Sequence, residues 1–139
     1  MKNNYISKKY KNVIHIYDPV FFSNYYYVDV KTLKEFIEVV NKTWKVDLGI
    51  SKDSSIGGYC TELIRKDNNI SVVFWALPNK AYYLAHECIH AILYNFSDLG
   101  LNASNDNGEV LAYEVTFLMK EIEKYKGNRN GKNKIGRKS

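Results

Sequence analysis

A strand that leads directly into a helix dominates the middle of the sequence and limits the folds open to the chain. The run Ile70–Leu77 is rich in β-branched and aromatic residues and is the most strand-prone segment present. Pro78 should end this strand, and Asn79 is expected to cap the helix that follows. That helix should run from about residue 80 to residue 96. Such a pair of elements requires a sheet packed against helices.

Shorter strand signals lie on the N-terminal side of this unit. The segment Val13–Tyr17 predicts a strand that ends at the turn Asp18-Pro19. Tyr25–Val28 is expected to extend that strand or to pair with it. Tyr59–Arg65 predicts a further strand, which residues 66–69 should join to the central strand as a β-hairpin.

Two more helices are expected. Thr32 and Glu35 fit a capping box, in which a hydroxyl and a carboxylate satisfy free amides at a helix start. Apolar residues recur with helical spacing as far as Trp44, so this helix should end near Lys45. A last helix should run from about Gly108 to Tyr125. The expected fold class is α+β, with a short β-sheet packed on an N-terminal, a central and a C-terminal helix.

The basic charge of the chain is concentrated at its C-terminal end. The net charge is +5, but residues 124–139 hold seven Lys or Arg and no acid. We therefore expect one domain over residues 1–125 and a basic, disordered tail over residues 126–139. Such a tail can contact nucleic acid through phosphates, but it lacks interleaved aromatic residues, so this role is not favoured. Without an apolar span or a secretory leader, the expected location is the cytoplasm, away from membranes.

The central helix contains the motif His86-Glu87-Cys88-Ile89-His90, which is HExxH. Residues four apart lie on one helix face, so the two imidazoles can reach a single Zn²⁺ ion. Glu87 is offset by one residue and can instead take a proton from a metal-bound water. Two core histidines without a metal are the alternative interpretation, but the interposed glutamate favours a metal site.

A catalytic zinc ion usually has a third protein ligand, whose identity the spacing leaves open. His15 lies far upstream and is interpreted as a strand-surface residue. The downstream acids that could serve are Asp98, Asp106, Glu109 and Glu114. Glu109 falls in the first turn of the last helix, whereas Glu114 falls mid-helix at the edge of an apolar face. Helix geometry alone does not separate these two glutamates.

An HExxH helix followed about twenty residues later by a helical glutamate resembles the gluzincin group of zinc metallopeptidases. The segment Asn107–Tyr113 is similar to the Glu-x-x-Ala pattern of small ImmA/IrrE-type and phage-encoded zincins. The resemblance covers residues 70 to about 118 and implies a zincin-like domain with zinc as its cofactor. It further implies His86, His90 and Glu109 as the zinc ligands, with Glu87 as the general base.

The same resemblance implies roles for other segments. Many gluzincins carry an acid four residues after the ligand glutamate, and here that position is Tyr113, which could orient a ligand through its phenol. Tyr113 or Tyr94 could also stabilise the oxyanion. Zincin relatives further imply that the strand Ile70–Leu77 forms an exposed sheet edge that pairs with an extended substrate.

The expected function is therefore that of a zinc-dependent metallopeptidase acting on a protein or peptide substrate. The alternative is a catalytically silent zincin-like module that binds a protein partner through the sheet edge, or nucleic acid through the tail. The intact Glu87 favours the enzyme, because a purely structural metal site does not need a base beside the metal.

Overall fold

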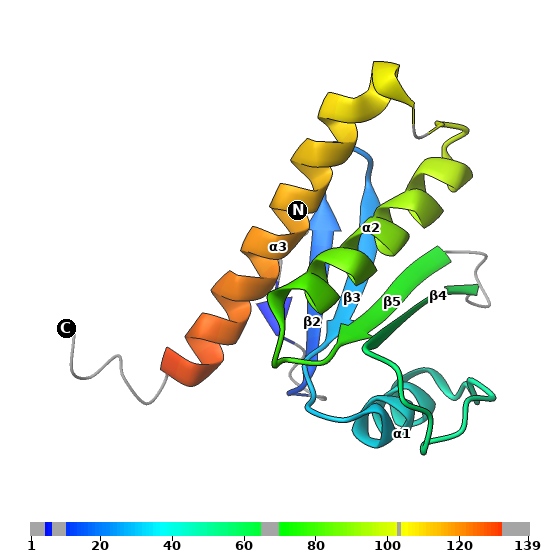
Figure 1. Cartoon of the computed structure of the whole chain (residues 1–139), viewed down its shortest axis with the longest axis vertical. Helices are drawn as coiled ribbons and strands as arrows, with labels where there is room; N and C mark the ends of the chain where they lie inside the picture. Colours follow the sequence, from blue (N-terminus) through cyan, green and yellow to red (C-terminus); the bar gives the residue numbers. More distant parts are fainter. Residues whose placement is uncertain (1–4, 7–10, 65–69, 103, 132–139) are drawn as a thin grey trace.

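The computed structural model describes residues 5–6, 11–64, 70–102 and 104–131 of the chain. Within these ranges it has five strands, three α-helices and one short 3₁₀ helix, η1 (Figure 1). The expected α+β class is confirmed at this level. In chain order the elements are β1 (Tyr5–Ile6), β2 (Val13–Asp18), β3 (Ser23–Val28), α1 (Leu33–Trp44), β4 (Gly58–Ile64), β5 (Ile70–Ala76), α2 (Ala81–Asp98), η1 (Asn105–Asn107) and α3 (Gly108–Gly131).

The five described strands form one mixed sheet in the order β1-β2-β3-β5-β4. Neighbouring strands are antiparallel except β3 and β5, which are parallel. Consequently β5 lies inside the sheet and β4 lies at its edge. The expectation that Ile70–Leu77 forms the exposed edge is therefore wrong. Residues 71–76 are all buried. A strand that is largely apolar on both faces is stable in the interior of a sheet, where both faces are covered.

Helices cover both faces of this sheet (Figure 1). Alternate residues of β5 point to opposite faces, so Phe74 packs in the core beneath α2 and α3, while Trp75 packs in the core with α1. The indole Nε1 of Trp75 donates a hydrogen bond to the carbonyl oxygen of Val30 at 2.9 Å. The sheet thus separates two apolar cores, and α2 lies on the outer side of one of them.

The first helix begins and ends where its local signals indicate. In α1 the Thr32 hydroxyl accepts a hydrogen bond from the Glu35 amide at 3.2 Å, as a capping box requires. Lys45 ends the helix in the left-handed conformation, with φ of 59°.

The other two helices differ from expectation at their ends, and α2 ends at Asp98, two residues later than expected. Lys80, not Asn79, is the N-cap of α2. The expected end of the last helix near Tyr125 is also wrong, because α3 continues through Gly127 to Gly131. A single glycine costs a helix only about 1 kcal/mol and does not by itself end it. The expected disordered tail is thus helical over residues 126–131, and its remainder, 132–139, lies outside the described residues. Among the described helices, none is both long and apolar enough to span a membrane.

Candidate active site

Helix α2 holds His86 and His90 one turn apart on its exposed side. Their Nε2 atoms are 3.1 Å apart, and their ring centroids are separated by 4.7 Å with the planes at 70°. The i, i+4 spacing brings the two side chains together in this way. The two rings thus turn the same nitrogen atom toward each other.

This pair of imidazoles suits a divalent metal ion. Two nitrogen ligands of a tetrahedral zinc ion, each at about 2.0–2.1 Å, lie about 3.4 Å from one another. The observed Nε2–Nε2 distance of 3.1 Å is close to that separation. The same contact also suits an N–H···N hydrogen bond in which one neutral ring donates to the other. The two histidines therefore fit as two of the three ligands expected for a catalytic zinc ion.

Glu87 lies on the inner side of the histidine pair, with only 6% of its surface exposed. The first residue of β4, Gly58, passes directly against it. A Cβ atom on Gly58 would lie 2.6 Å from both Cγ and Oε2 of Glu87 and 2.7 Å from the carbonyl oxygen of Trp75. Burial raises the pKa of Glu87, and the nearby His86 opposes this effect. The carboxyl group is thus held in a partly desolvated place where it binds a proton more readily than in water.

A pocket of about 410 Å³ opens beside His86 and Glu87. Its other lining residues come from the start of β4, from the two residues before it and from the first turn of α2: Ile56, Gly57, Gly58, Tyr82 and Tyr83. The two tyrosines were missed in the sequence, although Tyr82 precedes His86 by four residues and Tyr83 precedes Glu87 by four. That helical spacing is the signal that could have found them.

The structure does not bring Glu109 to the two imidazoles. Glu109 is exposed in the first turn of α3, and α3 starts beside the C-terminal end of α2 (Figure 1). From His90 to Asp98, α2 rises by about 12 Å at 1.5 Å per residue. In the ranges that the structure describes, no group of three or more His, Cys, Asp or Glu side chains is arranged to hold a metal ion.

Glu114, the other helical glutamate, belongs to a different environment. It is 2% exposed and forms a hydrogen-bonded pair with Asp18, also 2% exposed, at the end of β2. Burial, and then the contact with Asp18, raise the pKa of Glu114 to about 8. Tyr25 lies next to both carboxyl groups and near Asn95 of α2. Glu114 therefore faces the buried ends of β2 and β3 and not the exposed side of α2.

The remaining candidate ligands also have other positions. Asp98 is hydrogen-bonded to Glu62 of β4, and burial together with this contact raises the pKa of Glu62 to about 7. Asp106 is exposed in η1. The interpretation of His15 as a surface residue is wrong, because it is 7% exposed. Its Nε2 atom is 2.7 Å from Oδ1 of Asn24.

The two tyrosines expected near the reaction lie apart from this pocket. Tyr113 is 70% exposed on α3. Tyr94 is half-buried on α2, one helical turn after His90, and its pKa is raised by burial and by Cys60 and Glu62 of β4. Tyr94 is thus the one of the two that shares a helix face with the histidines.

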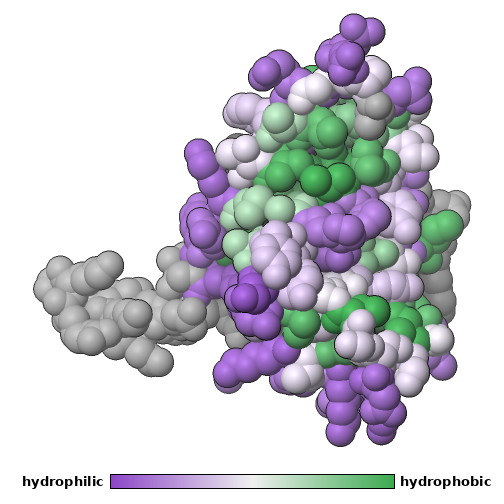
Figure 2. All heavy atoms as spheres, in the orientation of Figure 1, coloured by the Kyte–Doolittle hydropathy of each residue, from purple (hydrophilic) through white to green (hydrophobic). Residues whose placement is uncertain are grey.

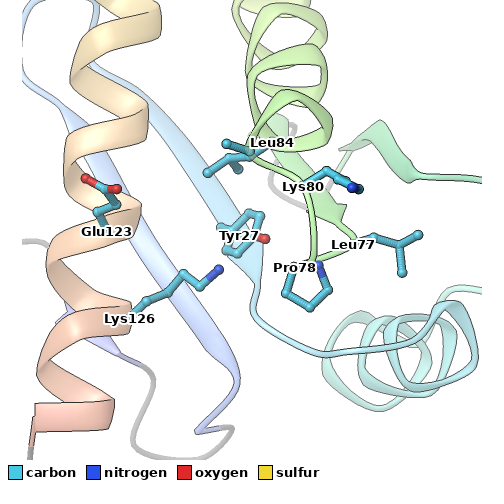
Figure 3. Close-up of a pocket in the computed structure, with 8 residues that line it drawn as sticks. Tyr27, Leu77, Pro78, Lys80, Leu84, Glu123 and Lys126 are labelled. Atoms are coloured by element: carbon cyan, nitrogen blue, oxygen red, sulfur yellow. The ribbon is translucent and has the colours of Figure 1, made fainter.

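A second pocket, of about 300 Å³, lies between the start of α2 and the later turns of α3 (Figure 3). Figure 3 shows Lys126 of α3 pointing toward the ring of Tyr27, and its Nζ atom is 5.8 Å from the ring centroid. The same Nζ atom is 3.8 Å from a carboxylate oxygen of Asp29. Because none of the HExxH residues lines it, this pocket is separate from the one beside the histidines.

Comparison of the chain with known protein families, with curated proteins and with solved structures finds no match.

Proposed function

We propose that the protein is a zinc-dependent peptidase, with His86 and His90 as metal ligands and Glu87 as the general base. The observation that supports this most is the meeting of the two Nε2 atoms at 3.1 Å, beside a pocket that both His86 and Glu87 line. A zinc ion bound there would supply Lewis-acid chemistry, polarising a peptide carbonyl and making water more acidic.

The position of Glu87 suits the transfer of a proton. Its carboxyl group is largely buried, lines the pocket and has a raised pKa, so it can accept a proton from the attacking water. The same group can then pass that proton to the leaving amine. The lack of a side chain on Gly58 makes room for the Glu87 side chain, because a Cβ atom on Gly58 would collide with Glu87.

The edge strand β4 is our proposed site for the substrate backbone. Among the described strands it pairs only with β5, so its other edge is open to an added strand. Its first residue lies against Glu87, so a peptide paired along β4 would pass the pocket. The substrate-binding edge is thus moved from the strand Ile70–Leu77, as expected from the sequence, to its hairpin partner.

We propose Glu109 as the third ligand on the basis of the resemblance, with Tyr113 on the same helix as the residue that orients a ligand. Both side chains are exposed, so neither is held in place by core packing. For Glu109 to reach the histidines, the first turn of α3 must move toward the middle of α2.

Zinc content tests the ligand set. We expect about one zinc ion per chain in the wild type and in Glu114→Gln, and a marked loss in Glu109→Gln, because a catalytic site needs three protein ligands. Glu114→Gln is the matched control, since that residue lies on the same helix but pairs with Asp18. Full zinc content in Glu109→Gln would remove Glu109 from the ligand set. A wild type without zinc would exclude the zinc peptidase.

Loss of the base tests the reaction. Glu87→Gln should retain zinc but lower the cleavage rate of an unfolded protein substrate by about 10²–10⁴-fold, the usual contribution of a general base. Glu38→Gln, an exposed change on α1, serves as the control and should leave the rate unchanged. Equal rates in the wild type and in Glu87→Gln would refute the role of Glu87.

A binding module without catalysis is the second candidate. Figure 2 shows an apolar area on the face where α2 and α3 lie side by side. Ile89, Leu99 and Val110 are exposed large apolar residues of this part of the chain, and such areas often mark contacts with other proteins. Cleavage that depends on Glu87 would decide against this candidate.

A further inference from the structure

The pocket beside His86 and Glu87 has features that bear on substrate choice. We propose that it selects an uncharged apolar or aromatic side chain of the substrate, next to the bond that is cleaved. This inference rests on the peptidase function proposed above, and it assigns Ile56, Tyr82 and Tyr83 as specificity-determining residues.

The rim of the pocket presents large apolar groups to solvent. Ile56 is 37% exposed and Tyr82 is 63% exposed, and both line the pocket. Neither lysine nor arginine is among the described residues that line it. A side chain that covers these groups would remove apolar surface from water, which favours apolar partners.

The aromatic wall of the pocket is fixed by the glycine beside it. A Cβ atom on Gly57 would lie 2.5 Å from Cδ1 of Tyr83, so the ring packs against the bare backbone of this residue. Tyr82 in turn packs edge-on against Tyr83, with the ring centroids 4.9 Å apart. The wall is thus built into the fold and does not need the substrate to form it.

The position of Glu87 explains why a charged side chain in the pocket would slow cleavage. An acidic side chain in the pocket would face the Glu87 carboxyl group, which lines the same space. A basic side chain would pair with that carboxylate and compete with its role as a base. The volume of about 410 Å³ lies near the lower end for ligand pockets and suits one large side chain with its adjoining backbone.

Cleavage of a matched peptide series tests the proposal. The probes are ten-residue peptides of Ala and Ser that carry one variable residue, Phe or Asp. The wild type loaded with zinc should cleave the Phe peptide about 10- to 100-fold more efficiently, at a bond next to Phe, as expected for one buried side chain. Ile56→Arg should reverse part of this preference, because its guanidinium would pair with Asp. Leu99→Arg, exposed at the end of α2 and outside the pocket, should leave the preference unchanged.

Binding of the same peptides separates this proposal from the peptidase function. We would measure their affinities by calorimetry with the zinc-free protein, which keeps the Glu87 carboxyl group in the pocket, as the wild type and as Ile56→Arg. The proposed pocket would be supported if the Phe peptide binds more tightly than the Asp peptide and if Ile56→Arg weakens the binding of the Phe peptide. This support would hold even if the wild type cleaves neither peptide, because the absence of cleavage would refute only the peptidase function. Equal affinity for Phe and Asp peptides, or the same shift in Leu99→Arg, would overturn the proposed selectivity.

Discussion

The buried pair of Asp18 and Glu114 should make the protein less stable as the pH rises through neutrality. Glu114 has a pKa of about 8 in the folded chain against 4.5 as a free side chain, because burial and Asp18 disfavour its charged form. The folded state therefore holds a proton that the unfolded state releases between these two values. The stability that this proton contributes is complete below pH 4.5 and is lost as the pH rises to 8.

The size of the effect follows from the difference between the two pKa values. At about 1.4 kcal/mol per unit, the full difference corresponds to at most about 5 kcal/mol of unfolding free energy. This is a large part of the stability of a typical domain, which is about 5–15 kcal/mol. Glu114→Gln should remove most of this loss of stability at high pH, because the amide remains neutral and can still donate a hydrogen bond to Asp18.

Urea unfolding followed by circular dichroism at pH 5 and pH 8 measures this difference. At pH 5 the unfolding free energies of the wild type and Glu114→Gln should differ by no more than about 1 kcal/mol, since the substitution replaces one neutral hydrogen-bond donor with another. At pH 8 the variant should be more stable by several kcal/mol, up to the limit of about 5 given above. Glu62 also has a raised pKa, but it titrates in both proteins and cancels in the comparison. The same pH dependence in both proteins would refute the argument.

Two glycine substitutions give further predictions. Gly58→Ala should lower the unfolding free energy by about 1–3 kcal/mol and also slow cleavage, because the new Cβ would lie 2.6 Å from Glu87 and 2.7 Å from the Trp75 carbonyl oxygen. Gly108→Ala is the matched control, since nothing lies within 4 Å of its Cβ and its φ is −61°, and it should be neutral or stabilising by up to about 1 kcal/mol in urea unfolding. Equal effects of the two substitutions would show that the space around Gly58 is not limiting.

Local signals predicted most of the helices and strands. The capping box at Thr32, the stop at Pro78 and the alternation of strand and turn residues depend on neighbours within a few positions. They placed the end of α1 to within one residue and found the antiparallel pairing of β4 with β5. The turn between these two strands, residues 66–69, lies outside the described residues.

Strand order was the part of the fold that these signals could not supply. Whether β5 is an edge or an interior strand depends on its parallel pairing with β3, for example of Val72 with Tyr25. The evidence in the sequence was the run of apolar residues on both faces, which is typical of interior strands. The analogy with zincin relatives led instead to the wrong edge.

The candidate site shows the same division between local and distant contacts. The meeting of His86 and His90 follows from helical spacing alone. The environment of Glu114 does not, because its partner Asp18 comes from the other end of the chain and no helical wheel includes it. The packing of the Tyr83 ring against Gly57 in the pocket wall likewise joins residues from separate segments, so local spacing does not predict it.

The parallel contact of β3 with β5 has a consequence for how the sheet assembles. Each antiparallel hairpin, β2 with β3 and β4 with β5, joins strands that are close in sequence. Joining the hairpins brings Tyr25 beside Val72, which is 47 positions later in the sequence, with α1 and β4 between them. Loop-closure entropy grows with the logarithm of length, so docking the two hairpins costs more chain entropy than forming either one. We therefore expect that the rate at which the sheet folds depends on this contact between its two halves.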